Sequence, residues 1–287
     1  MLFGAHVSSS GGISNAIDRA EALGCDAIQV FTQSPRMWRP TAHPPEQVAR
    51  FRARRAEAGI GAVVCHAPYL VNLASADRTI RTRSVAAVEA SLDAASAIGA
   101  EAVIFHVGSH LGAGMGVARR RVVPALRRLL ERTTDGLWLL MENSAGAGGT
   151  IGRSTDELES LLEALDGHRR LGLCLDSCHW WVSGVDVTDP AVLDAALGEL
   201  DRRVGLARVR CLHVNDAAAG LGSNRDRHAS IGEGEMGRGL GTFVAHPAFR
   251  ELPAILETPG PEGRGPDAAE VRRLRALYRA ARRRART

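Results

Sequence analysis

Six histidine and acidic residues recur along the chain, each at the end of a short apolar run. They are His66, His106, Glu142, Asp176, His213 and Glu257. Neighbouring members are 34 to 44 residues apart, which is about the length of one βα unit. In a parallel barrel the carboxyl ends of all strands lie on one rim, so these side chains would converge there.

The combination of residue types predicts a cation site. An ordinary hydrogen-bonded role would suffice for any one of the six, but three histidines and three carboxylates on one rim would leave desolvated charges unless cations lie among them. Imidazole and carboxylate without thiolate suit Zn²⁺, Mn²⁺ or Fe²⁺, and three or more imidazoles favour zinc.

Two further segments add metal-ligand types near the same rim. His179 follows Asp176 by three residues in "DSCHW", and Asp226 and His228 lie in "GSNRDRHASIGEGEMG", residues 222–237. That stretch has few apolar side chains to bury, which is typical of a surface loop. We expect it to fold over the rim and to form a further site with His179. Nine ligands are too many for one ion.

A competing hypothesis is a Cys₂His zinc site formed by Cys174, Cys178 and His179. Side-chain alternation disfavours it, because residues two before each rim residue share its face and should form an apolar layer beneath the rim. The predicted layer consists of Val64, Ile104, Leu140, Cys174, Cys211 and Ile255. Cys65 should point to the opposite face, toward the helices.

Eight short apolar runs alternate with segments of helical pattern. The runs are residues 2–6, 27–31, 62–66, 102–106, 137–142, 171–176, 209–213 and 253–257. Between them, Ser154 with Glu157 forms a capping box, and Asp189 before Pro190 predicts a helix start. The pattern predicts an α/β fold, a (β/α)8 TIM barrel, with one domain over residues 1–287. An open doubly wound sheet is the alternative.

Composition sets broader limits. The 287-residue chain is 45% hydrophobic, carries a formal net charge of +4 and has a sequence pI of about 9.1. It contains no lysine, so its positive charge is arginine. Residues 266–287 predict a last amphipathic helix with an arginine-rich tail, for which a solvated face is favoured over a nucleic-acid arm. A polyanionic partner is compatible with this charge.

The cysteines and the N-terminus bear on location. Five cysteines are scattered through apolar segments, which favours reduced thiols in an intracellular protein. The sequence "MLFGAHVSSSGG" lacks a basic n-region and a sustained apolar stretch, and no window reaches the ~18 apolar residues of a membrane span. We expect a cytoplasmic protein without a membrane partner.

The rim residues lie in a series of motifs that resembles the endonuclease IV family of abasic-site (AP) DNA repair endonucleases. The motifs are "GAHVSSSGG", "HAPYLVNLA", "FHVGSH", "LMENSAGAG", "CLDSCH", "LHVNDA", "RDRHASIGEGEMG" and "ILETP". Several are weak alone, but their order and spacing over nearly the whole chain are specific.

The resemblance implies a TIM barrel with three zinc ions. By this likeness His66, His106 and Glu142 hold the first ion, and Glu142 bridges to the second, which Asp176, His213 and Glu257 complete. The third ion is held by His179, Asp226 and His228. Three Zn²⁺ ions against four carboxylates leave about +2 at the rim, which would attract a phosphodiester.

The likeness also implies a reaction. A hydroxide between the first two zinc ions would attack phosphorus in line, oriented or deprotonated by Glu142 and Glu257, while the third zinc stabilises the departing 3′-oxygen. The expected cut in duplex DNA lies 5′ to the abasic site and leaves a 3′-hydroxyl and a 5′-deoxyribose phosphate. Family members also trim blocked 3′ ends. Neither a nucleotide cofactor nor an oligomer is expected, so the protein should act as a monomer.

Substrate recognition should fall to the rim loops. Family members insert loop side chains into the duplex and swing the abasic nucleotide into the pocket. The candidates here are Arg36, Met37, Tyr69 and Leu70, although loop packing competes for Met37. His6 and His110 are expected to contact metal ligands and hold them in position without binding an ion themselves.

Two other functions fit parts of the pattern. Divalent-metal sugar isomerases and epimerases of the xylose-isomerase type also carry histidine and acidic residues on a barrel rim, but Asp226, His228 and His179 would be superfluous there. A non-catalytic binder of damaged DNA with structural zinc would be expected to have a closed, thiolate-rich site instead.

Overall fold

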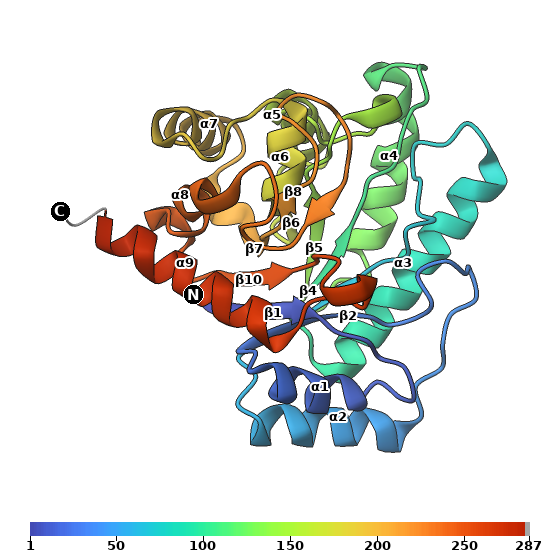
Figure 1. Ribbon diagram of the computed structural model, residues 1–287. Coiled ribbons are helices and arrows are strands. Elements are labelled where there is room, and N and C mark those ends of the chain that lie inside the picture. The colour runs from blue at the N-terminus through green and yellow to red at the C-terminus, as the bar shows by residue number, and fades with distance from the viewer. Residues whose placement is uncertain (285–287) are drawn as a thin grey trace.

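The computed structural model describes residues 1–284, and its centre is a closed barrel of eight parallel strands (Figure 1). The strands are β1 (Leu2–His6), β2 (Ala27–Phe31), β3 (Ala62–His66), β4 (Ala102–Phe105), β5 (Trp138–Glu142), β6 (Leu171–Asp176), β7 (Val209–His213) and β10 (Pro253–Leu256). The first strand pairs with the last, with Gly4 opposite Ile255. This closure confirms the predicted (β/α)8 TIM barrel and shows that the open-sheet alternative is wrong.

Helices cover the outside of the barrel (Figure 1). They are α1 (Asn15–Leu23), α2 (Pro45–Glu57), α3 (Arg78–Ile98), α4 (Met115–Leu130), α5 (Thr155–Glu163), α6 (Ser177–Ser183), α7 (Pro190–Arg203), α8 (Leu240–Val244) and α9 (Ala268–Arg284). Short 3₁₀ turns occupy Ala147–Gly149, Leu206–Arg208, Gly237–Gly239, Pro247–Phe249 and Pro261–Gly263. Helix α9 is the predicted arginine-rich helix; residues 285–287 of its predicted tail lie outside the described residues.

The predicted helix starts are confirmed. Ser154 caps α5 by accepting the backbone N–H of Glu157, and the Glu157 carboxylate accepts N–H groups of Gly152 and Arg153. Asp189 caps α7, whose first residue is Pro190. These caps satisfy backbone donors that a helix start leaves free. They fix the points at which the chain turns from the rim into the outer layer.

Alternation along the strands separates two apolar regions. The barrel interior holds one buried cluster, which contains all six residues of the predicted layer, together with Ala27, Ala62 and Ala102. Cys65 belongs to the larger cluster between strands and helices, as expected. Each rim side chain therefore stands on a packed apolar floor, which holds strand positions tightly because interiors are packed near crystal density.

The loop after β7 folds back over the barrel rim as a small hairpin. Its strands are β8 (Asp216–Ala217) and β9 (His228–Ala229), which pair antiparallel. The fully buried carboxylate of Asp216 accepts backbone N–H groups from four residues of the following turn: Gly232, Gly234, Met236 and Gly237. At Gly234 a Cβ would lie 2.4 Å from the carbonyl oxygen of Ala217. One carboxylate and one glycine thus fix the course of the loop that carries Asp226 and His228.

The helices within residues 1–284 are too short or too polar to span a lipid bilayer.

Replacing Asp216 tests how far this loop depends on one side chain. Asp216→Ala should lower the free energy of unfolding by about 2–3 kcal/mol, because several buried N–H groups lose a charged acceptor. Asp216→Asn keeps one acceptor oxygen and should lose less. Urea denaturation measures both variants. Equal stability of Asp216→Ala and the parent protein would contradict this role.

Candidate metal centre

Nine rim side chains converge in three groups at the carboxyl ends of the strands. Within each group, one ligand-type atom per residue lies within 4.8 Å of the others. The groups are His66, His106 and Glu142; Glu142, Asp176, His213 and Glu257; and His179, Asp226 and His228. The structure thus brings all nine singled-out residues together, in the same three sets. His106 and Glu257 lie one residue beyond the ends of β4 and β10.

Glu142 lies at the middle of the arrangement, because its two oxygens contact histidines of all three groups. Its Oε2 is 3.1 Å from Nε2 of His66 and 3.6 Å from Nε2 of His106. Its Oε1 is 3.1 Å from Nδ1 of His213 and 3.2 Å from Nδ1 of His179. Since only 1% of its side chain is exposed, the carboxylate has given up nearly all contact with water. It belongs to two of the three groups named above.

Backbone carbonyls set the orientation of three imidazoles. Nδ1 of His66 donates to the carbonyl of Ala67 (2.6 Å), that of His179 to Asn143 (2.8 Å), and that of His228 to Glu257 (3.2 Å). A carbonyl can only accept, so each Nδ1 carries a proton and Nε2 is the nitrogen that faces the carboxylates, as in the 3.1 Å hydrogen bond between His66 and Oε2 of Glu142. Metal-binding histidines are commonly held in this way.

His213 is held in the opposite sense by Gln29. Its Nε2 donates to Oε1 of Gln29 (2.8 Å), which leaves Nδ1 facing Oε2 of Glu257 at 3.0 Å. The amide nitrogen of Gln29 donates in turn to Glu257 and His6. Gln29 was missed by the sequence reasoning. Its signal was a lone polar residue inside the apolar run "AIQVF", where it is fully buried.

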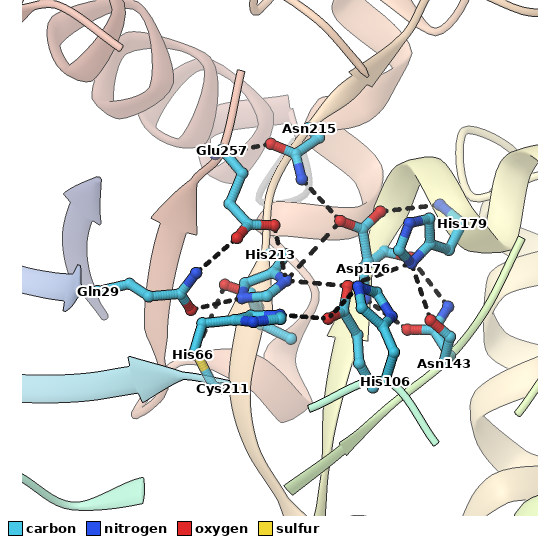
Figure 2. A network of polar contacts seen from close by, with 12 residues as sticks. Gln29, His66, His106, Asn143, Asp176, His179, Cys211, His213, Asn215 and Glu257 are labelled. Carbon is cyan, nitrogen blue, oxygen red and sulfur yellow. Dashed lines mark hydrogen bonds and ion pairs between the residues drawn. The ribbon is translucent and has the colours of Figure 1, made fainter. Parts of the chain in front are cut away.

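Two asparagines that the sequence reasoning also missed position Asp176. Asn143 accepts the backbone N–H of Asp176 (2.6 Å), and Asn215 donates to Oδ2 of Asp176 (2.6 Å) while accepting the backbone N–H of Glu257 (Figure 2). Asp176 also caps α6 by accepting the N–H of His179. Asn143 directly follows Glu142 in "MEN", and Asn215 lies two residues after His213 in "HVN".

The third group has an unpartnered nitrogen and an open side. Nε2 of His228 is buried with no hydrogen-bond partner, 3.4 Å from Oδ1 of Asp226 and 3.7 Å from Oδ2 of Asp176. The Asp226 side chain is half exposed, whereas that of His179 is buried. A buried lone pair facing carboxylate oxygens lacks a counterpart, which a cation would supply.

The ionisable side chains of the site lie close enough together to shift one another's pKa values. Burial favours neutral groups throughout, yet His106 and His213 hold the pKa of Glu142 well below its usual range. Burial opposes the charged form of His213 as well, but Glu257 and Glu142 raise its pKa to about 10. Burial raises the pKa of Asp226, but the neighbouring His179 ring outweighs this effect, and the pKa falls to about 2. Glu142 and Asp226 therefore remain ionised at neutral pH and attract positive charge.

The cysteines pack rather than form the alternative site. Cys174 lies in the barrel interior, while Cys178 belongs to the outer cluster and donates to the carbonyl of Arg227. The two thiols thus lie in different layers, which argues against a Cys174–Cys178–His179 zinc site. Burial raises the pKa of each.

The other singled-out residues lie around the rim in different settings. His6 contacts Glu257 at 3.5 Å. His110 instead braces its own loop, where Nδ1 accepts the N–H groups of Gly112 and Gly114. Met37 and Tyr69 are each 55% exposed. Arg36 is exposed and Leu70 is half-buried.

Two adjoining cavities open onto the site. One of about 340 Å³ is lined by residues of all three groups and by Tyr69 and Arg227. A second, of about 800 Å³, lies between the loops after β1 and β2 and shares Tyr69 and Glu257 with the first. Ligand-type side chains therefore face a space open to a substrate on the side of Tyr69.

Comparison with known proteins agrees with this arrangement. Residues 17–280 match the family model of the xylose isomerase-like TIM barrels. "Probable endonuclease 4" of Methanoculleus marisnigri is 40% identical over 279 residues, covering 96% of this chain and 99% of the relative. Its counterpart in Chloroflexus aggregans is 39% identical, covering 96% and 98%.

Solved structures point the same way. The crystal structure of endonuclease IV from Thermus thermophilus matches with a TM-score of 0.85 and 37% identity, covering 98% of this chain and all of the other. A D-tagatose 3-epimerase-like protein matches with a TM-score of 0.76 at 18% identity, a likeness of fold. The chain belongs to the endonuclease IV family of xylose isomerase-like TIM barrels.

Proposed function

We propose that this protein is a DNA repair endonuclease that hydrolyses the phosphodiester bond 5′ to abasic sites in duplex DNA, leaving a 3′-hydroxyl and a 5′-deoxyribose phosphate, and that it also trims blocked 3′ ends. The observation that carries the proposal is the joining of three ligand-type groups around Glu142 beside an open cavity. The relatives named endonuclease 4 support the reaction class. We infer that residues 1–287 act as one domain, as a monomer in the cytoplasm.

The residues fit three zinc ions. His66, His106 and Glu142 would hold one, Glu142 with Asp176, His213 and Glu257 a second, and His179, Asp226 and His228 a third. The donor set is imidazole and carboxylate, which suits zinc. The unpartnered Nε2 of His228 and the orientation of the His66 and His179 rings by backbone carbonyls support this assignment. When bound, such ions polarise a phosphate and stabilise a departing oxyanion.

The two proposed catalytic carboxylates have different surroundings. Glu142 is sealed from solvent, so its part is to hold the imidazoles of two groups in register. Glu257 is 13% exposed, lines both cavities, and is held by Gln29 at Oε1 while Oε2 faces His213. Glu257 is thus the better placed to orient the attacking water and to accept its proton at Oε2.

The rim loops would bind the duplex. Arg36 offers a phosphate contact, Met37 presents exposed apolar surface on the same loop, and the exposed Tyr69 lines both cavities. Leu70, next to Tyr69, is less exposed and would pack behind it. Side chains of this kind can wedge into an opened base step and leave the abasic nucleotide free to enter the smaller cavity.

The competing function is a metal-dependent sugar isomerase or epimerase. The epimerase-like structures share the fold at low identity. The group formed by His179, Asp226 and His228 favours the nuclease, because a third cation suits a substrate with several phosphate oxygens.

An incision assay tests the proposal directly. A duplex with one tetrahydrofuran abasic analogue should be cut on its 5′ side by the metal-replete protein, and prolonged chelation should abolish the cut. Asp226→Ala should lose at least about 100-fold in rate. Asp194→Ala, an exposed acidic residue paired with His246, is the control. Ketose–aldose interconversion without incision would favour the isomerase instead.

Gln29 provides a test of ligand positioning. Gln29→Leu leaves Nε2 of His213 without its acceptor and frees Glu257, so affinity for the second metal ion should fall about 10- to 100-fold. Metal content after dialysis against graded chelator measures this. Gln47→Leu, which removes a bond to Ser14 away from the ligands, should retain the parent's metal content. Unchanged retention in Gln29→Leu would refute the role.

Metal uptake should release protons. Glu257 and Glu142, against the effect of burial, raise the pKa of His213 to about 10, so the metal-free ring is charged at pH 7.5 and must lose a proton to bind a cation at Nδ1. Apparent metal affinity should therefore rise with pH up to about 10. Titration calorimetry in buffers of different ionisation enthalpy counts the protons. Zinc binding without proton release would contradict this expectation.

A further inference from the structure

Leu111, at the tip of the loop between β4 and α4, combines two unfavourable features. It is 76% exposed, the highest exposure among the exposed large hydrophobic side chains of residues 1–284. Its φ of 46° lies in the left-handed region, where the other non-glycine residues of the described chain are the polar Asp166, Asn224 and Glu262. A leucine gains nothing from either feature within the folded monomer.

The loop under Leu111 is firmly held. The N–H of Leu111 donates to Oγ of Ser109 (3.1 Å), and that hydroxyl donates to the carbonyl of Gly148 (2.6 Å). The His110 ring accepts two loop N–H groups and packs so closely that a Cβ on Gly149 would lie 2.6 Å from it. The tip is therefore a braced structure, and the strained backbone at Leu111 is imposed by its surroundings.

Hydrogen bonds connect this loop to the two loops that carry the other exposed apolar tips. Oδ1 of Asn72, three residues after Tyr69, accepts the N–H of Ser109 at 3.1 Å. The N–H of Tyr69 donates to the carbonyl of Pro35, two residues before Met37. The loops after β2, β3 and β4 thus form one braced series along the rim. Each presents one large apolar side chain to solvent.

We propose that Leu111 is a third apolar contact to duplex DNA, acting with Met37 and Tyr69. The inference rests on the proposed function. Leu111 lies on the loop that follows the ligand-type residue His106 and belongs to none of the ligand groups. An apolar side chain on a rigid support suits a partly unstacked base step, where it exchanges water for a base face. A preformed contact also avoids the ordering cost of a flexible loop. Leu111 would thus contribute to binding and leave the chemistry unchanged.

A substitution series separates apolar contact from backbone strain. Leu111→Gly and Leu111→Asn both suit a positive φ but remove the apolar side chain, whereas Leu111→Met keeps an apolar one. Affinity is measured by fluorescence anisotropy on a duplex with a tetrahydrofuran site and a non-hydrolysable linkage on its 5′ side. Gly and Asn should weaken binding about tenfold, the scale of burying one leucine. Met should stay within about twofold of the parent.

Stability and rate provide the controls. Leu111→Gly should melt at or above the parent's temperature, because the strain is relieved, and single-turnover incision at saturating protein should stay within about twofold. Asp166→Gly relieves the same backbone strain at the opposite end of the barrel and should bind DNA like the parent. Val192→Ala, on the outer helix α7, removes another exposed apolar side chain and should also be neutral.

Each outcome decides the inference. Weaker binding by Gly and Asn with an unchanged incision rate supports it. Equal affinity across the series, in a parent protein that incises abasic duplex, overturns the role of Leu111 and leaves the proposed function standing. A parent that neither binds nor incises the duplex overturns both.

Discussion

The arrangement depends on one carboxylate that is buried among imidazoles. Glu142 is almost fully removed from water, and four histidine rings lie within 3.1–3.6 Å of its two oxygens. A charge in such a place is tolerated only when positive charge surrounds it. Because each oxygen serves two rings, Glu142 fixes the spacing of the groups on either side. Removing it would leave four rings without their common partner.

The barrel provides the stiffness that this crowding requires. Like-charged carboxylates and neighbouring imidazoles would move apart if the strand ends could shift, but each ligand-type residue of a strand stands on a packed apolar layer. The side-chain amides around them hold the ligand-type residues in position by hydrogen bonds. Gln29 binds His213 in this way, and Asn143 and Asn215 bind Asp176. Such buried networks are favourable only when every member is satisfied. In this site Nε2 of His228 is buried without a hydrogen-bond partner, and the proposed cation would supply one.

The loop after β7 brings two ligand-type residues to the rim, although it has almost no apolar side chains that could pack into a core. Asp216 replaces that missing core with a buried carboxylate that gathers four backbone N–H groups. Polar side chains fix the loop after β4 as well. There the His110 ring and the Ser109 hydroxyl bind loop N–H groups and hold Leu111 toward solvent. Polar side chains thus fix the loops, as apolar ones fix the barrel.

The amino-acid sequence alone predicts the barrel and the residues that converge on its rim, because strand alternation and the repeat of βα units are local properties of the chain. His66 and Asp176 are the last residues of β3 and β6, as predicted. Cys174 and Cys211 lie in the inner layer, as side-chain alternation predicts. The ring orientations, the part of Gln29 and the exposure of Leu111 arise only in the folded protein. Those depend on contacts between segments as far apart as Gln29 and Glu257, which meet only when the barrel closes.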